Sequence, residues 1–174
     1  MNEPVYYGRV SKFLHWLIAF LIVGMLILGY FMFDIPNKDL RYQMVDIHKL
    51  TGLAILALMI FRITWSLTHP KPLEWPPTAA WQRLAERSVH YLLYSALVFM
   101  PLSGWCMSVA AGYVPKFYSL NFNLPIEKNK AVADYWEGIH NTLAVVIIVL
   151  ISLHVLAALY HYLIKKDKVL QRML

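Results

Sequence analysis

Seven histidines occur in this chain of 174 residues, and three of them lie in one uncharged stretch, residues 138–164. Two of the three, His140 and His154, are fourteen residues apart. On a helix that spacing is about 21 Å, and it falls only about 40° short of four whole turns. Two imidazoles would then lie on nearly one helix face, too far apart to bind the same ion. Because neutral imidazole is a common metal ligand, the stretch predicts two separate metal sites, each needing a partner from another element.

Suitable partners open the first two apolar segments of the chain. His15 lies near the start of the first segment and His48 at the start of the second. If successive segments cross a membrane in alternating directions, His48 reaches the depth of His140, and His15 approaches that of His154. The rival pairing of His15 with His161 would place the two sites about 31 Å apart, which is a poor distance for electron transfer between them.

A small residue follows each of these four histidines one helical turn later. Positions i and i+4 share a helix face, and a flat macrocycle wider than one turn needs clearance there. His90 and His161 are instead followed by Tyr94 and Lys165. Small residues also serve ordinary helix packing in membranes, but the pattern favours a haem iron at each site. The four small residues are Ala19, Gly52, Ala144 and Ala158.

Other metal chemistry has little support in the sequence. Zinc and copper sites need several ligands that converge on one point, often with a carboxylate. The apolar segments contain no acidic residue, and no H-E-x-x-H motif is present. The missing intramembrane acid also argues against a proton-coupled transporter. Cys106 is the single cysteine, so no internal disulfide and no covalent haem attachment through two cysteines is expected.

The composition is that of an all-α membrane protein. Hydrophobic residues make up 59% of the chain, charged residues 15%, and the mean hydropathy is +0.51. We expect one domain, 1–174, with four membrane spans near 10–33, 47–67, 88–112 and 137–164. Residues 81–87 are expected to form an amphipathic approach to the third span. Arg62 should extend toward the interface, and Pro101 should kink its helix.

The basic residues predict the orientation of this four-helix bundle. The N-terminus, the second connection and the C-terminus together carry ten Lys/Arg against four acids, whereas the other two connections carry six against six. The whole excess charge of +6 therefore lies on one side, which places both termini in the cytoplasm. Membrane topology and attraction to anionic lipid explain the basic residues on this side. No nucleic-acid partner is expected.

Several motifs together resemble the prokaryotic cytochrome b561 family over essentially the whole chain. They are H-W at 15–16, H-K-L-T-G at 48–52, H-Y-L-L-Y at 90–94, H-N-T-L-A at 140–144, His154, and H-Y-x-x-K-K-D at 161–167. The resemblance implies a multi-pass protein of the bacterial inner membrane with two haem b groups. His15, His48, His140 and His154 would be the axial ligands, and a quinone such as ubiquinone would be the electron acceptor.

The resemblance implies an oxidoreductase that takes electrons from a donor at the outer face, superoxide in one bacterial member, and passes them to quinone at the cytoplasmic side. One alternative is a cytochrome b subunit of a larger respiratory complex, with a partner protein. Another is a haem-free scaffold or transporter. A quinone head needs hydrogen-bond donors beside an apolar slot. The candidates on the cytoplasmic side are His161, Arg87, His90, Ser11 and Arg9.

Two further features have simpler interpretations. Lysines of the outer connections could steer a small anion toward the outer haem, but the six acids on the same side favour the simpler interpretation that they are solvated surface charges. They are Lys49, Lys116, Lys128 and Lys130. His69 lies in a proline-rich connection and is expected to have no functional role.

Overall fold

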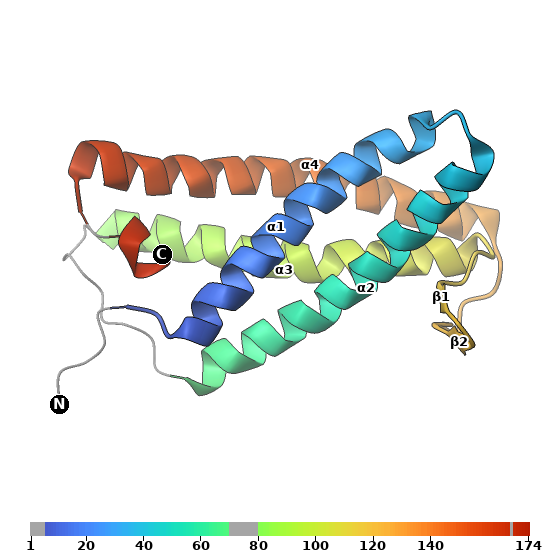
Figure 1. The fold of residues 1–174 in the computed structure, drawn as a ribbon, viewed down its shortest axis with the longest axis horizontal. Coiled ribbons are helices and arrows are strands. Elements are labelled where there is room, and N and C mark those ends of the chain that lie inside the picture. The colour runs from blue at the N-terminus through green and yellow to red at the C-terminus, as the bar shows by residue number, and fades with distance from the viewer. Residues whose placement is uncertain (1–5, 70–79, 168) are drawn as a thin grey trace.

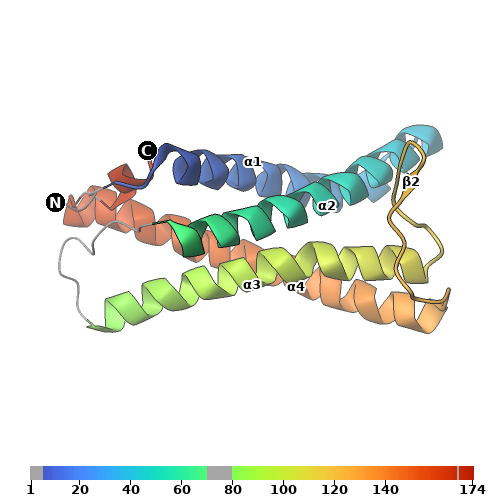
Figure 2. The same ribbon diagram turned by 90° about the horizontal axis from the view of Figure 1, so that it is seen from below.

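The chain folds into a bundle of four long helices in a computed structural model, which describes residues 6–69, 80–167 and 169–174 (Figures 1 and 2). The helices are α1 (Arg9–Phe31), α2 (Lys38–Thr68), α3 (Ala80–Ala110) and α4 (Lys130–Tyr160). All four are long and apolar enough to cross a membrane. The predicted fold class, a four-helix membrane bundle, is confirmed.

Three of the helices extend beyond the predicted membrane spans. The helix α2 begins nine residues before position 47, where the Asn37 side chain accepts a hydrogen bond from Leu40 N. The helix α4 begins at Lys130, after an Asn129 cap that accepts from two main-chain amides. Both are 31 residues long, or about 46 Å, against a hydrocarbon core of about 30 Å. Their polar first turns are therefore helical outside the core. The stretch 81–87 is likewise part of α3.

The helix pairs α1–α2 and α3–α4 are antiparallel, and each pair contributes to a core near the middle of the bundle (Figures 1 and 2). Ile147 is 1% exposed and lies seven residues from both His140 and His154. Apolar packing therefore separates the two histidine levels. The cluster contains Ile18, Ile22, Ile55, Met59, Ala96, Ile147 and Leu150.

The outward faces of the helices are apolar as well. Phe20 is 77% exposed on α1, Ile60 is 55% exposed on α2, Phe99 is 60% exposed on α3, and Leu156 is 62% exposed on α4. Such large exposed apolar faces are unfavourable in water and are expected where lipid is the solvent. The protein therefore contacts membrane lipid around the bundle.

One end of the bundle carries a short β-hairpin and is called the hairpin end below. The strands β1 (Lys116–Phe117) and β2 (Leu120–Asn121) are antiparallel and follow α3. Trp105 Nε1 donates to Phe122 O at 2.7 Å, which fixes the hairpin connection to α3. The 3-10 helix η1 (Met32–Asp34) joins α1 to α2 at this end. The sequence indicated only a polar connection here, and the hairpin was not predicted.

The opposite end, called the terminal end, holds both ends of the described chain. After α4 come a π-helix, η2 (His161–Lys165), and a 3-10 helix, η3 (Leu170–Arg172). The last residues return to α1, where Trp16 Nε1 donates to Met173 O at 2.8 Å and Lys12 Nζ donates to Leu174 O. Tyr7 N donates to Arg172 O at 3.3 Å, and burial raises the pKa of the Tyr7 phenol. The cytoplasmic placement of this end stays a prediction.

Candidate functional site

The four histidines singled out from the sequence form two pairs across the bundle. At the terminal end, the ring centres of His15 on α1 and His154 on α4 are 6.1 Å apart. At the hairpin end, those of His48 on α2 and His140 on α4 are 6.2 Å apart. These are called the terminal pair and the hairpin pair. Because α4 contributes one member to each pair, its fourteen-residue spacing separates the two levels.

The ring separations match the spacing of two imidazoles on opposite sides of one metal ion. A metal–nitrogen bond is about 2 Å, and the centre of an imidazole ring lies about 1.1 Å beyond its nitrogen. Two coaxial ligands therefore place their ring centres about 6.3 Å apart. Both observed separations are within 0.2 Å of that figure. Within each pair, the two ring planes are inclined by 63° and 73°, and the ring centres lie at the spacing that one shared atom requires.

Each pair supplies only two ligands. Among the described residues, no group of three or more His, Cys, Asp or Glu side chains could hold a metal ion. A bare ion would need further ligands from the protein or from water. A metal that already has four in-plane ligands from a macrocycle needs only two more, which is the number that each pair could supply.

Hydrogen bonds beside the hairpin pair engage His140 Nδ1 and leave its Nε2 atom free to bind a metal. His140 Nδ1 lies 3.1 Å from Met100 O and 3.1 Å from Ser103 Oγ. A carbonyl only accepts, so the Nδ1 atom carries the proton and donates it to Met100 O. The Nε2 lone pair then points away from α3 and is available to a metal, which is the usual tautomer of a ligating histidine.

Two glycines make room for the rings of the hairpin pair. A Cβ atom added at Gly104 on α3 would lie 2.9 Å from His140 Cε1 and 3.1 Å from Nδ1. A Cβ added at Gly29 on α1 would lie 3.1 Å from His48 Cε1. The sequence reasoning missed both glycines because they lie on neighbouring helices. The available signal was a glycine inside an uncharged helix, where it is unfavourable without a packing reason.

The terminal pair has a cation beside it. An Arg62 terminal nitrogen lies 3.2 Å from His15 Nδ1, and Arg62 Nε donates to the Tyr94 hydroxyl at 3.3 Å. The expectation that Arg62 extends to the interface is therefore wrong, because its guanidinium turns into the bundle. Guanidinium groups only donate, so the Nδ1 atom of His15 accepts and its proton lies on Nε2. Ligation of a metal through Nε2 would require the opposite tautomer, with the proton on Nδ1, so it would exclude the present contact with Arg62.

A third histidine borders the terminal pair. The His90 ring on α3 lies edge to face with that of His154, with centres 5.2 Å apart. That separation is shorter than the spacing of two coaxial ligands on opposite sides of one metal. His90 Nδ1 donates to Glu86 O at 2.7 Å, one turn earlier on its own helix. The geometry therefore favours His15 over His90 as the partner of His154.

The comparisons with known proteins agree on one family. The family model described as prokaryotic cytochrome b561 matches residues 6–174. The chain belongs to the prokaryotic cytochrome b561 family. It is therefore a bacterial multi-pass membrane protein of a family that transfers electrons, and membership implies that it binds b-type haem.

Named relatives cover almost all of the chain. It is 33% identical to "Cytochrome b561 homolog 2" of Escherichia coli (strain K12), over 99% of this chain and 93% of the relative. It is 28% identical to "Cytochrome b561 homolog 1" of the same strain, over 97% of this chain and 96% of the relative. It is 31% identical to "Probable superoxide oxidase CybB" of Yersinia pestis, over 97% of this chain and 95% of the relative.

The site of this cytochrome b561 fits a b-type haem. Close main-chain packing within the described residues joins α3 to α4, α2 to α3 and α1 to α2, whereas α1 and α2 approach α4 closely at few points. Each histidine pair bridges one of these looser interfaces. The predicted clearance residues, Ala19, Gly52, Ala144 and Ala158, are all half-buried. Their role beside a haem stays a prediction.

The predicted quinone residues gather at the terminal end, although they do not form one cluster. His161 bonds to Asp167 at 2.6 Å. His90 borders the terminal pair. Arg9 and Ser11 lie in the first turn of α1, and Arg87 is an exposed residue of α3. His69 stacks on Trp65, with ring centres 3.5 Å apart, away from both pairs.

Two of the four outer lysines are neutralised by nearby acids. Lys49 Nζ lies 2.7 Å from Asp46 Oδ1, and Lys130 Nζ lies 2.7 Å from Asp134 Oδ2. A paired charge produces a weaker field at a distance than an isolated one. These pairs favour the simpler interpretation of the outer lysines as surface charges.

Proposed function

We propose that this cytochrome b561 carries electrons across the inner membrane through two haem b groups, from a donor at the hairpin end to a quinone at the terminal end. The observation that carries the proposal is the pair of histidine–histidine separations, 6.1 and 6.2 Å, at two levels of one bundle. The hairpin end faces the outside in this proposal, and the terminal end faces the cytoplasm, as the basic residues predict.

His48 and His140 would hold one haem, and His15 and His154 would hold the other. When bound, the haems supply one-electron carriers that can pass single electrons between the two faces. The chain's contribution is to fix both ligands of each pair, to keep water away and to set the spacing. Fourteen residues of α4, about 21 Å of helix, together with the apolar core around Ile147, define that spacing.

Superoxide is the proposed donor. A relative 31% identical to this chain is named "Probable superoxide oxidase CybB", which supports the same substrate here. The reaction balances: two superoxide anions lose one electron each and become two molecules of O₂. One quinone takes the two electrons and two protons and becomes a quinol. The protons come from the cytoplasmic side, where His161 is the proposed contact for the quinone head.

The decisive experiment is a reduced-minus-oxidised absorption spectrum of the purified protein, with the ratio of haem to chain. We expect two haems per chain. The single variants His48→Ala and His140→Ala should each lose the haem of the hairpin pair, and His15→Ala and His154→Ala that of the terminal pair. A ratio near one, or variants of one pair that lose different haems, would overturn the assignment.

Turnover of the isolated protein tests whether the chain acts alone. Superoxide generated in the presence of a short-chain ubiquinone should yield quinol with no other protein present. Haem-loaded protein that fails to do so would instead favour an electron-transfer subunit, whose activity depends on a partner. Protein that contains no haem at all would contradict both functions.

A further inference from the structure

The carboxylate of Asp167 makes two hydrogen bonds at the terminal end. Its Oδ2 atom accepts from His161 Nδ1 at 2.6 Å, and its Oδ1 atom accepts from Val169 N at 3.1 Å. Both side chains are largely shielded, with 20% of the His161 side chain and 15% of the Asp167 side chain exposed. A short contact between an imidazole and a shielded carboxylate is stronger than one at an open surface.

The local fold brings Asp167 back under His161. The last turn of the fourth helix is the π-helix η2, and Lys166 follows it in the left-handed conformation, with φ 52°. This conformation is uncommon for a residue other than glycine. It reverses the chain so that Asp167 N donates to His161 O at 3.2 Å. Single-turn π-helices and left-handed residues are both concentrated at functional sites, and here they serve the approach of one carboxylate to one imidazole.

The contact assigns different roles to the two ring nitrogens of His161. The Nδ1 atom donates to Asp167, which leaves Nε2 as the nitrogen that a substrate can reach. The carboxylate also stabilises the positive charge of a protonated ring. A protonated His161 held in this way has one N–H directed at Asp167 and a second, on Nε2, that it can donate elsewhere.

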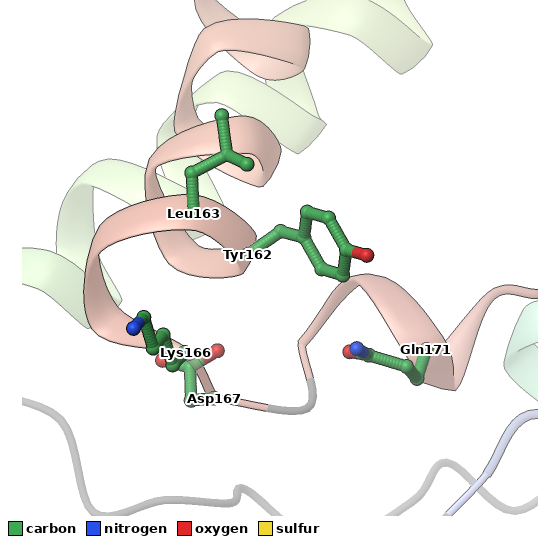
Figure 3. Close-up of a pocket in the computed structure, with 5 residues that line it drawn as sticks. All are labelled: Tyr162, Leu163, Lys166, Asp167 and Gln171. Atoms are coloured by element: carbon green, nitrogen blue, oxygen red, sulfur yellow. The ribbon is translucent and has the colours of Figure 1, made fainter.

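Asp167 also lines a pocket of about 360 Å³ (Figure 3). The pocket lies between η2 and η3, and Tyr162, Leu163, Lys166, Asp167 and Gln171 line it. The Gln171 Oε1 atom is buried and has no hydrogen-bond partner within the described residues. A recess of this size with polar lining residues admits water, so Asp167 contacts both an aqueous pocket and His161.

We propose that Asp167 is a positioning residue for quinone reduction, holding His161 as the proton donor to the quinone oxygen. The proposal rests on the proposed function, which supplies the two electrons. As the quinone accepts them, the Nε2–H bond of His161 breaks and an O–H bond forms on one quinone oxygen. Two protons from the cytoplasmic solution, relayed by water that the pocket admits, complete the balance: one goes to the second quinone oxygen and the other returns to His161. His161 is seven residues beyond His154, about two turns on the same helix face.

The test isolates the quinone half of the reaction. Haem-loaded protein is reduced with dithionite, freed of excess reductant without oxygen, and mixed rapidly with a short-chain ubiquinone while haem oxidation is followed by absorbance. In Asp167→Asn, the amide oxygen can still accept from Val169 N, but the amide group stabilises no positive charge on His161. We expect the rate at saturating quinone to fall by about tenfold or more, with the half-saturating quinone concentration changed less than about twofold.

Two further variants separate positioning from structural support. Asp167→Glu keeps the carboxylate and should retain most of the rate, whereas the matched control Asp39→Asn, an exposed residue at the opposite end, should leave it unchanged. In a His161→Gln background, Asp167→Asn should have no further effect, because its action passes through the missing imidazole. Haem content and spectra of every variant should equal those of the wild type.

Three outcomes would overturn the proposal: a normal rate in Asp167→Asn, an equal loss in Asp167→Glu, or an unchanged effect of Asp167→Asn in the His161→Gln background. Failure of the proposed function looks different. In that case the reduced wild-type protein itself transfers no electrons to quinone, whichever residue is at position 167.

Discussion

A methyl group added at Gly104 should remove the haem of the hairpin pair and leave the other haem in place. The added Cβ would lie 2.9 Å from His140 Cε1, closer than real Cβ atoms approach, and 3.1 Å from His140 Nδ1, which is tighter than most real contacts. The ring is held by the bond from Nδ1 to Met100 O, at 3.1 Å. To avoid the methyl group it must turn and lose that bond, and the Nε2 atom then turns away from His48.

The expected loss of haem affinity is the sum of two costs, overpacking and the lost hydrogen bond. Overpacking of a fitted site costs about 1–3 kcal/mol, and the lost hydrogen bond about 1 kcal/mol more. A total of roughly 2–4 kcal/mol corresponds to about 30- to 1,000-fold weaker haem binding at this pair. We expect purified Gly104→Ala to contain close to one haem per chain, measured by the haem-to-protein ratio and the reduced-minus-oxidised spectrum.

Gly24→Ala is the matched control. A Cβ atom there would meet nothing within 4 Å, and alanine favours the helix over glycine by about 1 kcal/mol, so two haems and an unchanged or slightly higher melting temperature are expected. The crowding in Gly52→Ala lies between that of Gly24→Ala and that of Gly104→Ala, because its Cβ would make ordinary contacts at 3.9 and 4.0 Å. Full haem content and a normal spectrum in Gly104→Ala would refute the reasoning.

Three other perturbations test the surroundings of the two pairs. His90→Gln should retain two haems per chain, because the 5.2 Å spacing to His154 is too short for two coaxial ligands of one iron; loss of a haem would make His90 the true partner. Ser103→Ala removes a buried hydroxyl that donates to Met100 O at 2.8 Å. It should lower the free energy of unfolding by about 1 kcal/mol, measured by denaturant titration, and an unchanged value would mean that the bond contributes nothing. The double variant Lys49→Gln, Lys130→Gln should change the rate of superoxide oxidation by less than about twofold, since both lysines are ion-paired; a large, salt-dependent fall in rate would restore the steering hypothesis.

The sequence alone determined the four-helix membrane fold. Uncharged apolar segments long enough to cross a bilayer must become helices there, because lipid offers their main chain no hydrogen-bond partners. The positions of His140 and His154 on one face of one helix are equally local, since they depend only on the helical repeat. The pairings of His48 with His140 and of His15 with His154 followed from depth in the membrane, and the ring separations agree with them.

The sequence could not predict the side-chain contacts between helices. A glycine within an apolar helix signals a packing reason, but the local pattern did not indicate that Gly29 and Gly104 would face the rings of the hairpin pair. It also did not indicate that Arg62 would turn to His15 rather than to the interface. Those outcomes depend on how each helix is rotated about its axis and shifted along its neighbours, which side-chain packing across the whole bundle decides.

At the terminal end, a few residues show the same contrast between what the sequence predicts and what the tertiary structure decides. The sequence singled out His161 as a quinone candidate from its place two turns beyond His154, and it included Asp167 only as part of a motif. Their hydrogen bond exists because a π-helix and one left-handed residue reverse the chain between them. The spacing of residues along a helix is a property of the helix itself, whereas the meeting of two side chains across a reversed turn is decided only by the tertiary structure.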